Sequence, residues 1–187
     1  MKVIFLDIDG VLNAAHNYVK NWKTQEDWLV FTKQHQRKAE ELGISMAFHM
    51  PVQYAIGWLN QLIEDTGAKV VITSTWRGRG VEYMQKVLDF EGVVCEVIGE
   101  TCNDEHWKTE DFIPSERMER IDEKDYDGYC RGDQIKDWLL QHPDVENYVI
   151  LDDDSDMLKE QKHHFVNVNN EHGFTRLDYV VAKNILK

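Results

Sequence analysis

The stretch VIFLDIDGVLN, Val3–Asn13, lies near the start of the chain and decides the fold class. Apolar residues run without interruption up to Asp7. Asp9 follows after one intervening residue, just before Gly10. A short, continuous apolar run is typical of a strand that is covered on both faces. Residues i and i+2 of a strand point the same way, so Asp7 and Asp9 are expected to face one pocket. The stretch therefore predicts a buried strand that ends in two carboxylates.

Similar apolar runs recur along the chain. We expect five strands, at Lys2–Leu6, Lys69–Thr73, Val93–Ile98, Tyr148–Leu151 and Phe165–Val168. Segments with helical periodicity lie at Val52–Asp65, Val81–Phe90, Asp133–His142, Ser155–Lys162 and Thr175–Leu186. This alternation predicts an α/β fold, a Rossmann-like doubly wound sheet of five parallel strands with helices on both faces. The ligand site of such a sheet lies at the carboxyl ends of its strands.

Length and composition fit one globular domain, residues 1–187. No stretch approaches transmembrane length and no signal-peptide pattern precedes the first strand, so we expect no membrane attachment. Three cysteines without metal-ligand spacing suit reduced thiols, which indicates the cytoplasm. A net charge of −13 argues against broad binding of duplex nucleic acid, although a local cation, an arginine and backbone N–H groups can still hold a single phosphate.

Two segments are too long to be simple connections between a strand and a helix. Residues 14–50 combine aromatic and basic side chains, and we expect a helix there with Thr24 as its N-cap and Gly43 just past its end. Residues 101–129 are dominated by Asp and Glu. Both segments follow strand ends at the same edge of the sheet, so we interpret them as small cap insertions over the ligand site.

A second group of carboxylates follows another apolar run in YVILDDDSD, Tyr148–Asp156, where three consecutive aspartates begin at Asp152. Adjacent carboxylates repel unless they share a proton or bind a divalent cation. If the first and fourth strands are neighbours, Asp152 meets Asp7 and Asp9, and oxygen ligands of this kind suit Mg²⁺. An ordinary polar turn is the alternative for either group alone. A calcium-binding loop is excluded, because Tyr18 stands where a bidentate Glu is required.

Hydroxyl and basic side chains end the second strand in VVITSTWRGRG, Val70–Gly80. Thr73 and Ser74 are candidates to donate hydrogen bonds to phosphoryl oxygens, with backbone N–H groups beyond them. Arg77 is a further candidate for substrate binding. The alternatives are an ordinary strand threonine for Thr73 and surface ion pairs for Arg77 and Arg79.

A third candidate stretch is YCRGDQIKDWLL, residues 129–140, where Arg131 immediately precedes a predicted helix. An arginine there can reach a phosphate or neutralise an aspartate in the pocket. The alternative is a solvated residue beside the acidic insertion.

These stretches, taken in order, resemble the motifs of the haloacid dehalogenase (HAD) superfamily of phosphohydrolases. The first motif is matched by Asp7-Ile-Asp-Gly-Val, the second by Thr73, the third by Arg131 in place of the frequent Lys, and the fourth by Asp152-Asp153. More narrowly, FLDIDGVLN, TSTWR, an arginine before IKDWL, and YVILDD are similar to the small HAD branch of RNA-repair multidomain proteins and of phage or bacterial stand-alone proteins.

The resemblance implies a catalytic role for each of four residues. Asp7 is the nucleophile that forms an aspartyl-phosphate, and Asp9 protonates the leaving oxygen and then deprotonates the hydrolytic water. Thr73 and Arg131 bind the transferring phosphoryl oxygens and stabilise charge in the transition state. Lys136, one turn into the helix, is the alternative for the third motif.

The resemblance also implies a Mg²⁺ site and a substrate side of the pocket. The metal ligands are the carboxylate of Asp7, the backbone carbonyl of Asp9, and Asp152, with Asp153 acting through water. Gly10 belongs to the substrate side, because a residue without a side chain lets the backbone turn tightly and leaves the pocket open.

The expected activity is therefore Mg²⁺-dependent hydrolysis of a phosphomonoester. An acid at Asp9 favours phosphate esters, because the dehalogenases of the superfamily lack one there. We expect a nucleotide or a single-stranded nucleic-acid end as substrate, with net acidity favouring the small nucleotide. The alternatives are a phosphatase of another small metabolite and a catalytically silent binding protein. The aromatic side chains of the first insertion either stack on a base or form a small core of their own: Trp22, Trp28 and Phe31.

Overall fold

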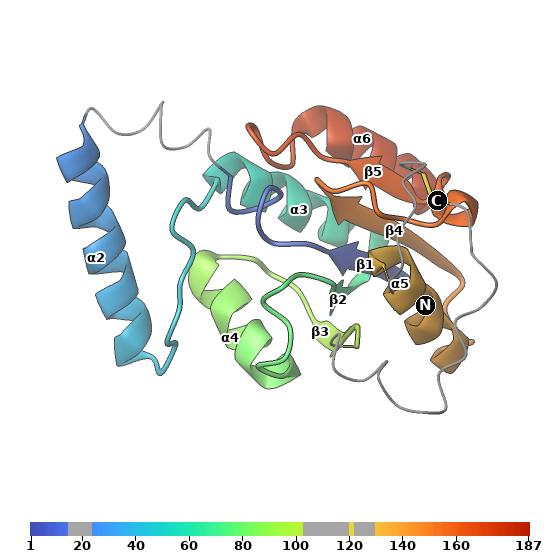
Figure 1. Cartoon of the computed structure of the whole chain (residues 1–187), viewed down its shortest axis with the longest axis horizontal. Helices are drawn as coiled ribbons and strands as arrows, with labels where there is room; N and C mark the ends of the chain where they lie inside the picture. Colours follow the sequence, from blue (N-terminus) through green and yellow to red (C-terminus); the bar gives the residue numbers. More distant parts are fainter. Residues whose placement is uncertain (15–23, 103–119, 122–129) are drawn as a thin grey trace.

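The computed structural model describes residues 1–14, 24–102, 120–121 and 130–187 (Figure 1). Its centre is a five-stranded sheet in the order β3-β2-β1-β4-β5, and every neighbouring pair is parallel. The strands are β1 (Lys2–Leu6), β2 (Lys69–Ile72), β3 (Val97–Glu100), β4 (Asn147–Asp152) and β5 (Phe165–Asn167). The predicted α/β fold is confirmed. β1 lies between β2 and β4, which is the neighbour relation that the two groups of carboxylates require.

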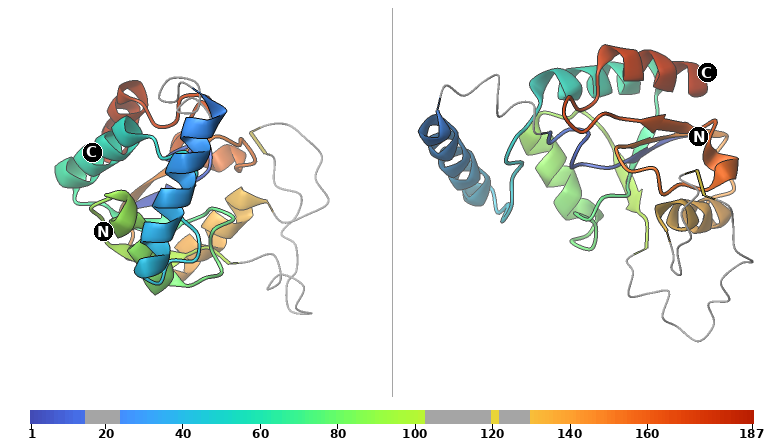
Figure 2. Two further views of the ribbon diagram at one scale, coloured as in Figure 1. Left: turned by 90° about the vertical axis from the view of Figure 1, so that its left-hand side faces the viewer. Right: turned by 45° about the horizontal axis from the view of Figure 1, so that its top comes forward.

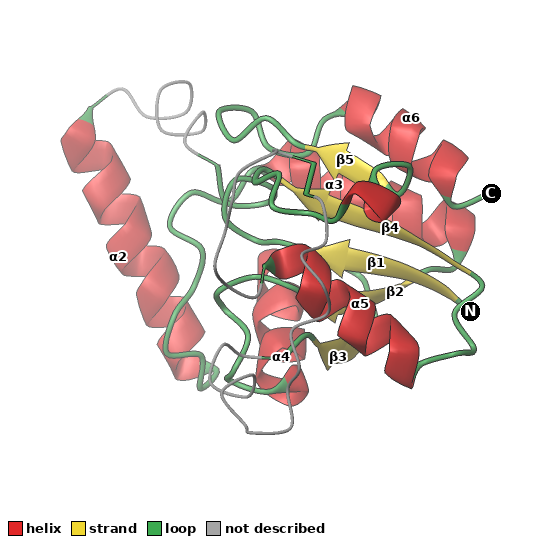
Figure 3. Cartoon of the chain, turned by 45° about the vertical axis from the view of Figure 1, so that its right-hand side comes forward, coloured by secondary structure: helices red, strands yellow, loops and turns green. Residues whose placement is uncertain are grey.

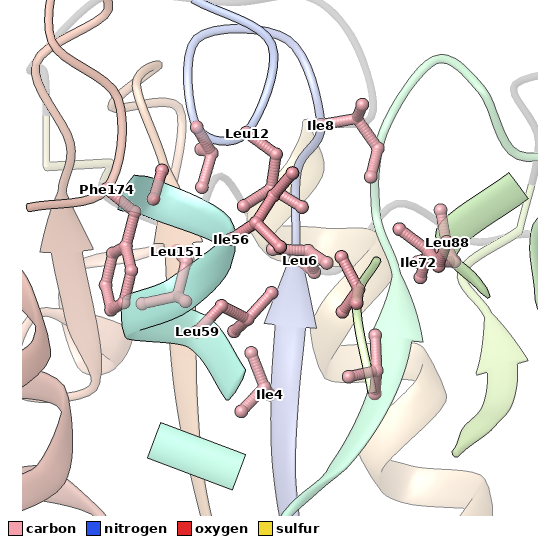
Figure 4. Close-up of a cluster of buried hydrophobic side chains, with 14 of the residues drawn as sticks. Ile4, Leu6, Ile8, Leu12, Ile56, Leu59, Ile72, Leu88, Leu151 and Phe174 are labelled. Carbon is pink, nitrogen blue, oxygen red and sulfur yellow. The ribbon is translucent and has the colours of Figure 1, made fainter. Parts of the chain in front are cut away.

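Helices cover both faces of the sheet (Figures 2 and 3). The helices of the sheet are α3 (Gln53–Thr66), α4 (Val81–Glu91), α5 (Arg131–Gln141) and α6 (Arg176–Ile185). Successive side chains of β1 point to opposite faces of the sheet, as in any β-strand. Ile4 and Leu6 belong to a cluster with α3, α4 and α6, shown in Figure 4, whereas Val3 and Phe5 pack with Ile135 of α5.

The third strand differs from its predicted position, Val93–Ile98, because β3 spans Val97–Glu100. The Glu96 carbonyl accepts a hydrogen bond from Val70 N of β2, but Val94 and Cys95 before it are held by helix side chains. Val94 N donates to Asn60 Oδ1 at 2.8 Å, and the amide of Gln85 bridges the Cys95 carbonyl and the Val97 N–H. The apolar run therefore begins as a connection and enters the sheet only at its end.

The helix predicted at Ser155–Lys162 is wrong, since this segment contains only a short 3₁₀ turn, η2 (Lys159–Gln161). Its polar groups bind the start of α5 in addition to one another, as Leu158 N does when it donates to Gln161 Oε1. Gln161 Nε2 donates to the Gly132 carbonyl at 2.8 Å, and Gly132 N donates to the Asp156 carbonyl at 3.2 Å. A Cβ at Gly132 would overlap Leu158 N, so only glycine permits this close approach. The segment thereby fixes the N-terminus of α5.

The first insertion contains the expected helix, α2 (Gln25–Glu41). Thr24 is its N-cap and accepts a hydrogen bond from Asp27 N at 3.1 Å, and Gly43 follows its end with φ +77°. Figure 3 shows α2 beyond the edge at which β1, β4 and β5 end. The second insertion, 101–129, lies largely outside the described residues, as does Trp22. In the part of the chain that is described, no helix is both long and apolar enough to cross a membrane.

Candidate active site

The hydrogen-bond ladder of the sheet continues into the site and sets its geometry. Leu6 of β1 pairs with Ile72 on one side and Leu151 on the other. One residue further along, Asp7 N donates to the Leu151 carbonyl at 3.0 Å, and Thr73 N donates to the Leu6 carbonyl at 2.9 Å. The side chains that follow the three central strands are therefore placed next to one another by backbone bonds.

A cluster of carboxylates forms at this edge from Asp7, Asp152 and Asp153, and Asp9, which was expected to meet Asp152 as well, is not part of it. One oxygen each of Asp7, Asp152 and Asp153 lies within 4.8 Å of the others. Asp7 is 5% exposed and Asp152 is 1% exposed, while Asp153 is half-buried. Gly10 has φ +79°, and a Cβ there would overlap the Asp153 carboxyl. Gly10 thus allows both the tight turn and the approach of Asp153.

Burial acts strongly on these carboxyl groups. Removal from water raises the pKa of Asp7 to about 6, and contacts with Arg131 and Ser74 offset only part of that effect. Burial also raises the pKa of Asp152 well above its usual range. Burial and then the charge of Asp154 raise the pKa of Asp153. The cluster carries more negative charge than its surroundings neutralise.

Arg131 is the cation that the described part of the chain places inside this cluster. Its NH1 donates to Asp7 Oδ1 at 2.9 Å, lies 3.2 Å from Asp152 Oδ2, and also donates to the Thr73 carbonyl. Its backbone N–H donates to Asp156 Oδ2 at 3.1 Å, which anchors the first turn of α5. Lys136 pairs instead with Glu160 at 3.3 Å near the surface. The geometry therefore favours Arg131 over Lys136 for the third motif.

The loop after β2 brings its hydroxyl groups to the same pocket. Thr73 is fully buried, and its Oγ1 has no hydrogen-bond partner among the described residues. The Ser74 hydroxyl contacts Asp7 and lowers its pKa. Arg77 braces the loop, because its guanidinium donates to the carbonyls of Thr73, Ser74 and Cys102 at 2.8, 3.0 and 3.1 Å. Substrate binding by Ser74 and Arg77 stays a prediction.

Asp9 lies outside the carboxylate cluster and in a different environment. Its side chain is exposed, and each of its oxygens accepts one hydrogen bond from a neutral donor. Asn13 Nδ2 donates to Oδ1 at 2.6 Å, and Trp76 Nε1 donates to Oδ2 at 2.8 Å. Asp7 and Asp9 thus leave one strand end with opposite surroundings, the first ion-paired and buried, the second accessible.

Four residues of the site were not predicted: Asn13 and Trp76 at Asp9, Asp156 at the backbone of Arg131, and Asn170, whose side chain contacts Asp153. Asp156 stands in the acidic run, which was a usable signal. Asn13 lies in the same loop as Asp9, four residues further on, whereas Trp76 and Asn170 contact carboxylates from other loops, and nothing in the local pattern marks these three.

The residues present fit a hard divalent cation. Three carboxylate oxygens within 4.8 Å of each other supply the ligand type that Mg²⁺ prefers, and the buried Asp152 Oδ2 has an ion pair with Arg131 but no hydrogen bond among the described residues. A doubly charged ion would offset the raised pKa values of the cluster.

The structure thus defines an α/β protein whose parallel sheet carries an acidic cluster, an arginine and a buried threonine at one edge. The chain matches the family described as "HAD domain in Swiss Army Knife RNA repair proteins" over residues 3–179, and it belongs to this family. The resemblance inferred from the motifs is confirmed. Comparison with curated proteins and with solved structures found no match. Family membership supports a hydrolase of the phosphatase type.

Proposed function

We propose that the protein is a Mg²⁺-dependent phosphomonoesterase that works through an aspartyl-phosphate on Asp7. The observation that carries the proposal is the position of Asp7, which is buried and in contact with Arg131, at the strand end beside Thr73, whose hydroxyl has no hydrogen-bond partner among the described residues. A nucleophile, an anion-binding cation and a threonine thus lie together at one edge of the sheet. These are the groups that transfer of a phosphoryl group to a carboxylate needs.

The proposed reaction has two steps. In the first, an oxygen of Asp7 attacks phosphorus, the bond from phosphorus to the ester oxygen breaks, and Asp9 gives that oxygen a proton. In the second, water attacks the phosphorus of the aspartyl-phosphate while Asp9 takes its proton. Inorganic phosphate leaves, and Asp7 is regenerated as a carboxylate. The exposure of Asp9 suits this role, since it must meet both the leaving group and water.

Charge on the transferring oxygens needs donors that are already in place. The guanidinium of Arg131 carries five N–H donors, so its contact with Asp7 leaves others for the phosphoryl oxygens. The Thr73 hydroxyl adds a further donor. It makes no hydrogen bond among the described residues, so none of those has to break before it binds substrate. When bound at Asp7, Asp152 and Asp153, Mg²⁺ supplies positive charge that lets an anionic nucleophile approach an anionic ester.

We propose a nucleotide or a phosphorylated nucleic-acid end as the substrate. The family description names RNA repair proteins, and α2, beyond the site edge, carries exposed basic side chains at Lys33, Arg37 and Lys38. Basic side chains beside a phosphate site suit a polyanionic substrate. The net charge of −13 limits this attraction to a local contact and favours a short substrate.

A substrate panel tests the proposal. Wild-type protein is incubated with nucleoside monophosphates, with oligoribonucleotides phosphorylated at the 3′ or the 5′ end, and with sugar phosphates, each with Mg²⁺ or with EDTA. We expect release of inorganic phosphate only with Mg²⁺, and faster release from the nucleotides and oligonucleotides. Acid-quenched samples are expected to contain phosphate on the protein, which Asp7→Asn abolishes.

A different result would overturn each part of the proposal. If phosphate were released from sugar phosphates about ten times faster than from every nucleotide, the proposed substrate class would be wrong but the phosphatase activity would stand. Phosphate release that survives in Asp7→Asn would overturn the nucleophile. No release from any ester by concentrated wild-type protein would overturn the enzyme and favour a binding protein.

A further inference from the structure

The carboxylate of Asp9 is held from two sides although it is exposed. Trp76 Nε1 and Asn13 Nδ2 each donate to a different oxygen, at 2.8 and 2.6 Å. A carboxylate has about four acceptor positions, so two bonds fix its plane and leave two positions for proton exchange. Without these bonds, an exposed Asp side chain would move among several rotamers. The arrangement therefore preorients Asp9 without blocking it.

Trp76 is itself rigid. Its side chain is 5% exposed and stands edge-on to Phe48, with ring centroids 5.3 Å apart and an interplanar angle of 84°. It lies only three residues after Thr73, in the loop that follows β2. The indole N–H is thus fixed relative to Thr73, the residue of this loop that is predicted to bind the phosphoryl oxygens.

Asn13 is fixed by the other end of its amide. Its Oδ1 accepts a hydrogen bond from Met50 N at 2.7 Å, and a backbone N–H can only donate. The oxygen must therefore face Met50, which leaves the NH₂ group facing Asp9. The side chain is 8% exposed, so both of its contacts are shielded. Phe48 and Met50 both lie at the end of the first insertion, so the two donors are supported by the same short segment.

We propose that Trp76 and Asn13 are positioning residues for Asp9, which hold its carboxyl group where the leaving oxygen must receive a proton. The inference rests on the proposed function and deepens it. Its consequence is selective: loss of either donor should slow the cleavage of esters whose leaving group needs a proton. Esters whose leaving group departs as a stable anion should be spared, because they need little help from an acid.

The test compares p-nitrobenzyl phosphate with p-nitrophenyl phosphate, which are similar in size but differ in leaving group. We expect Trp76→Phe, which keeps an aromatic ring on Phe48 and removes the N–H, to lower kcat/KM for the benzyl ester by about 10- to 100-fold. The value for the nitrophenyl ester should change by less than about threefold. Asn13→Ser should shift the ratio in the same direction, and Asp9→Asn should shift it further.

Two controls separate positioning from folding. The ratio of the two kcat/KM values in one preparation does not depend on the fraction of protein that is folded. Trp138→Phe makes the same chemical change at a tryptophan that is 6% exposed and packs on Phe5, on the opposite face of the sheet from α3. This variant should leave the ratio unchanged.

The outcomes are distinct. Equal losses on both esters in Trp76→Phe and Asn13→Ser would overturn the positioning role and leave the phosphatase intact. Wild-type protein that cleaves neither ester, nor any substrate of the panel, would overturn the proposed function itself.

Discussion

The floor of the site and the helix beyond its edge are held in place in different ways. The floor, formed by Asp7, Thr73 and Asp152, continues the ladder of the sheet and is almost completely buried. Helix α2 contributes a single fully buried side chain, Ala39. A main link between α2 and the rest of the molecule is the hydrogen bond between His35 Nε2 and Glu91 Oε1 at 3.0 Å.

This difference suggests that the two regions have different roles in the reaction. Side chains fixed by backbone bonds of a buried sheet keep their geometry, as catalytic groups require. An element held by a few side-chain contacts can open at low cost and can vary without disturbing the core. We therefore expect changes in the floor to abolish the reaction, and changes at α2 to alter access or substrate choice. The predictions below test that separation.

The largest effect is expected for Asp7→Asn. An amide cannot form the acyl-phosphate, so turnover of any ester should fall by at least about four orders of magnitude. The measurement is single-turnover phosphate release with Mg²⁺, with the folded state checked by circular dichroism. Residual turnover above about 1% of wild type would show that Asp7 is not the nucleophile.

The next effect is expected at Arg131. Arg131→Ala removes the cation that contacts Asp7 and Asp152, and kcat/KM should fall by about 10²- to 10³-fold. Lys136→Met is the matched control, because Lys136 pairs with Glu160 and should matter by less than about threefold. Free guanidinium added to Arg131→Ala should restore part of the rate. A larger loss in Lys136→Met than in Arg131→Ala would assign the third motif to the lysine.

The floor was predictable because its residues follow local rules. A carboxylate directly after an apolar run marks a strand end, and parallel strands bring such ends to one edge. Asp7 and Asp152 were found in this way, Thr73 was found as a hydroxyl residue at the end of the second apolar run, and α2 was found from its caps, Thr24 and Gly43.

The rest depends on contacts between segments that are distant in the chain. The Trp76 indole reaches Asp9 across 67 positions, and no periodicity in either loop records that contact. The predicted helix at Ser155–Lys162 failed for the same reason, because Gln161 and Asp156 bind the start of α5. Tertiary hydrogen bonds there outweigh the local preference for a helix.

A third prediction concerns the stability of the floor without metal. The pKa of Asp7 is raised from 3.8 to about 6 by burial, so the folded state binds a proton more tightly than the unfolded state does. The stabilising contribution of that proton is complete below pH 3.8 and is lost as pH rises through 6. Asp7→Asn removes the buried charge, so it should raise the free energy of unfolding at pH 7.5 by about 1–3 kcal/mol.

Urea unfolding in EDTA measures this difference. The gain of Asp7→Asn over wild type should shrink as pH falls from 7.5 to 4. A variant that is less stable than wild type at pH 7.5 would show that the ion pair with Arg131 outweighs the cost of burial.

The smallest effect on activity is expected at the link between α2 and α4. His35 is hydrogen-bonded to Glu91, stacks on Phe31 with ring centroids 5.2 Å apart, and lies tilted against Phe90 at 4.7 Å. His35→Ala should loosen α2 alone, raising amide hydrogen exchange in Gln25–Glu41 about tenfold while exchange in β1 is unchanged. Turnover of p-nitrophenyl phosphate should change by less than about threefold.

Arg37→Ala is the control for that change, because Arg37 lies on the same helix with its side chain 82% exposed. It should leave the exchange of α2 near the wild-type rate. If His35→Ala instead raised exchange equally in α2 and β1, the helix would unfold together with the sheet. The contrast between a fixed floor and a separately held helix would then be wrong, and α2 would have to be counted as part of the structure that positions Asp7.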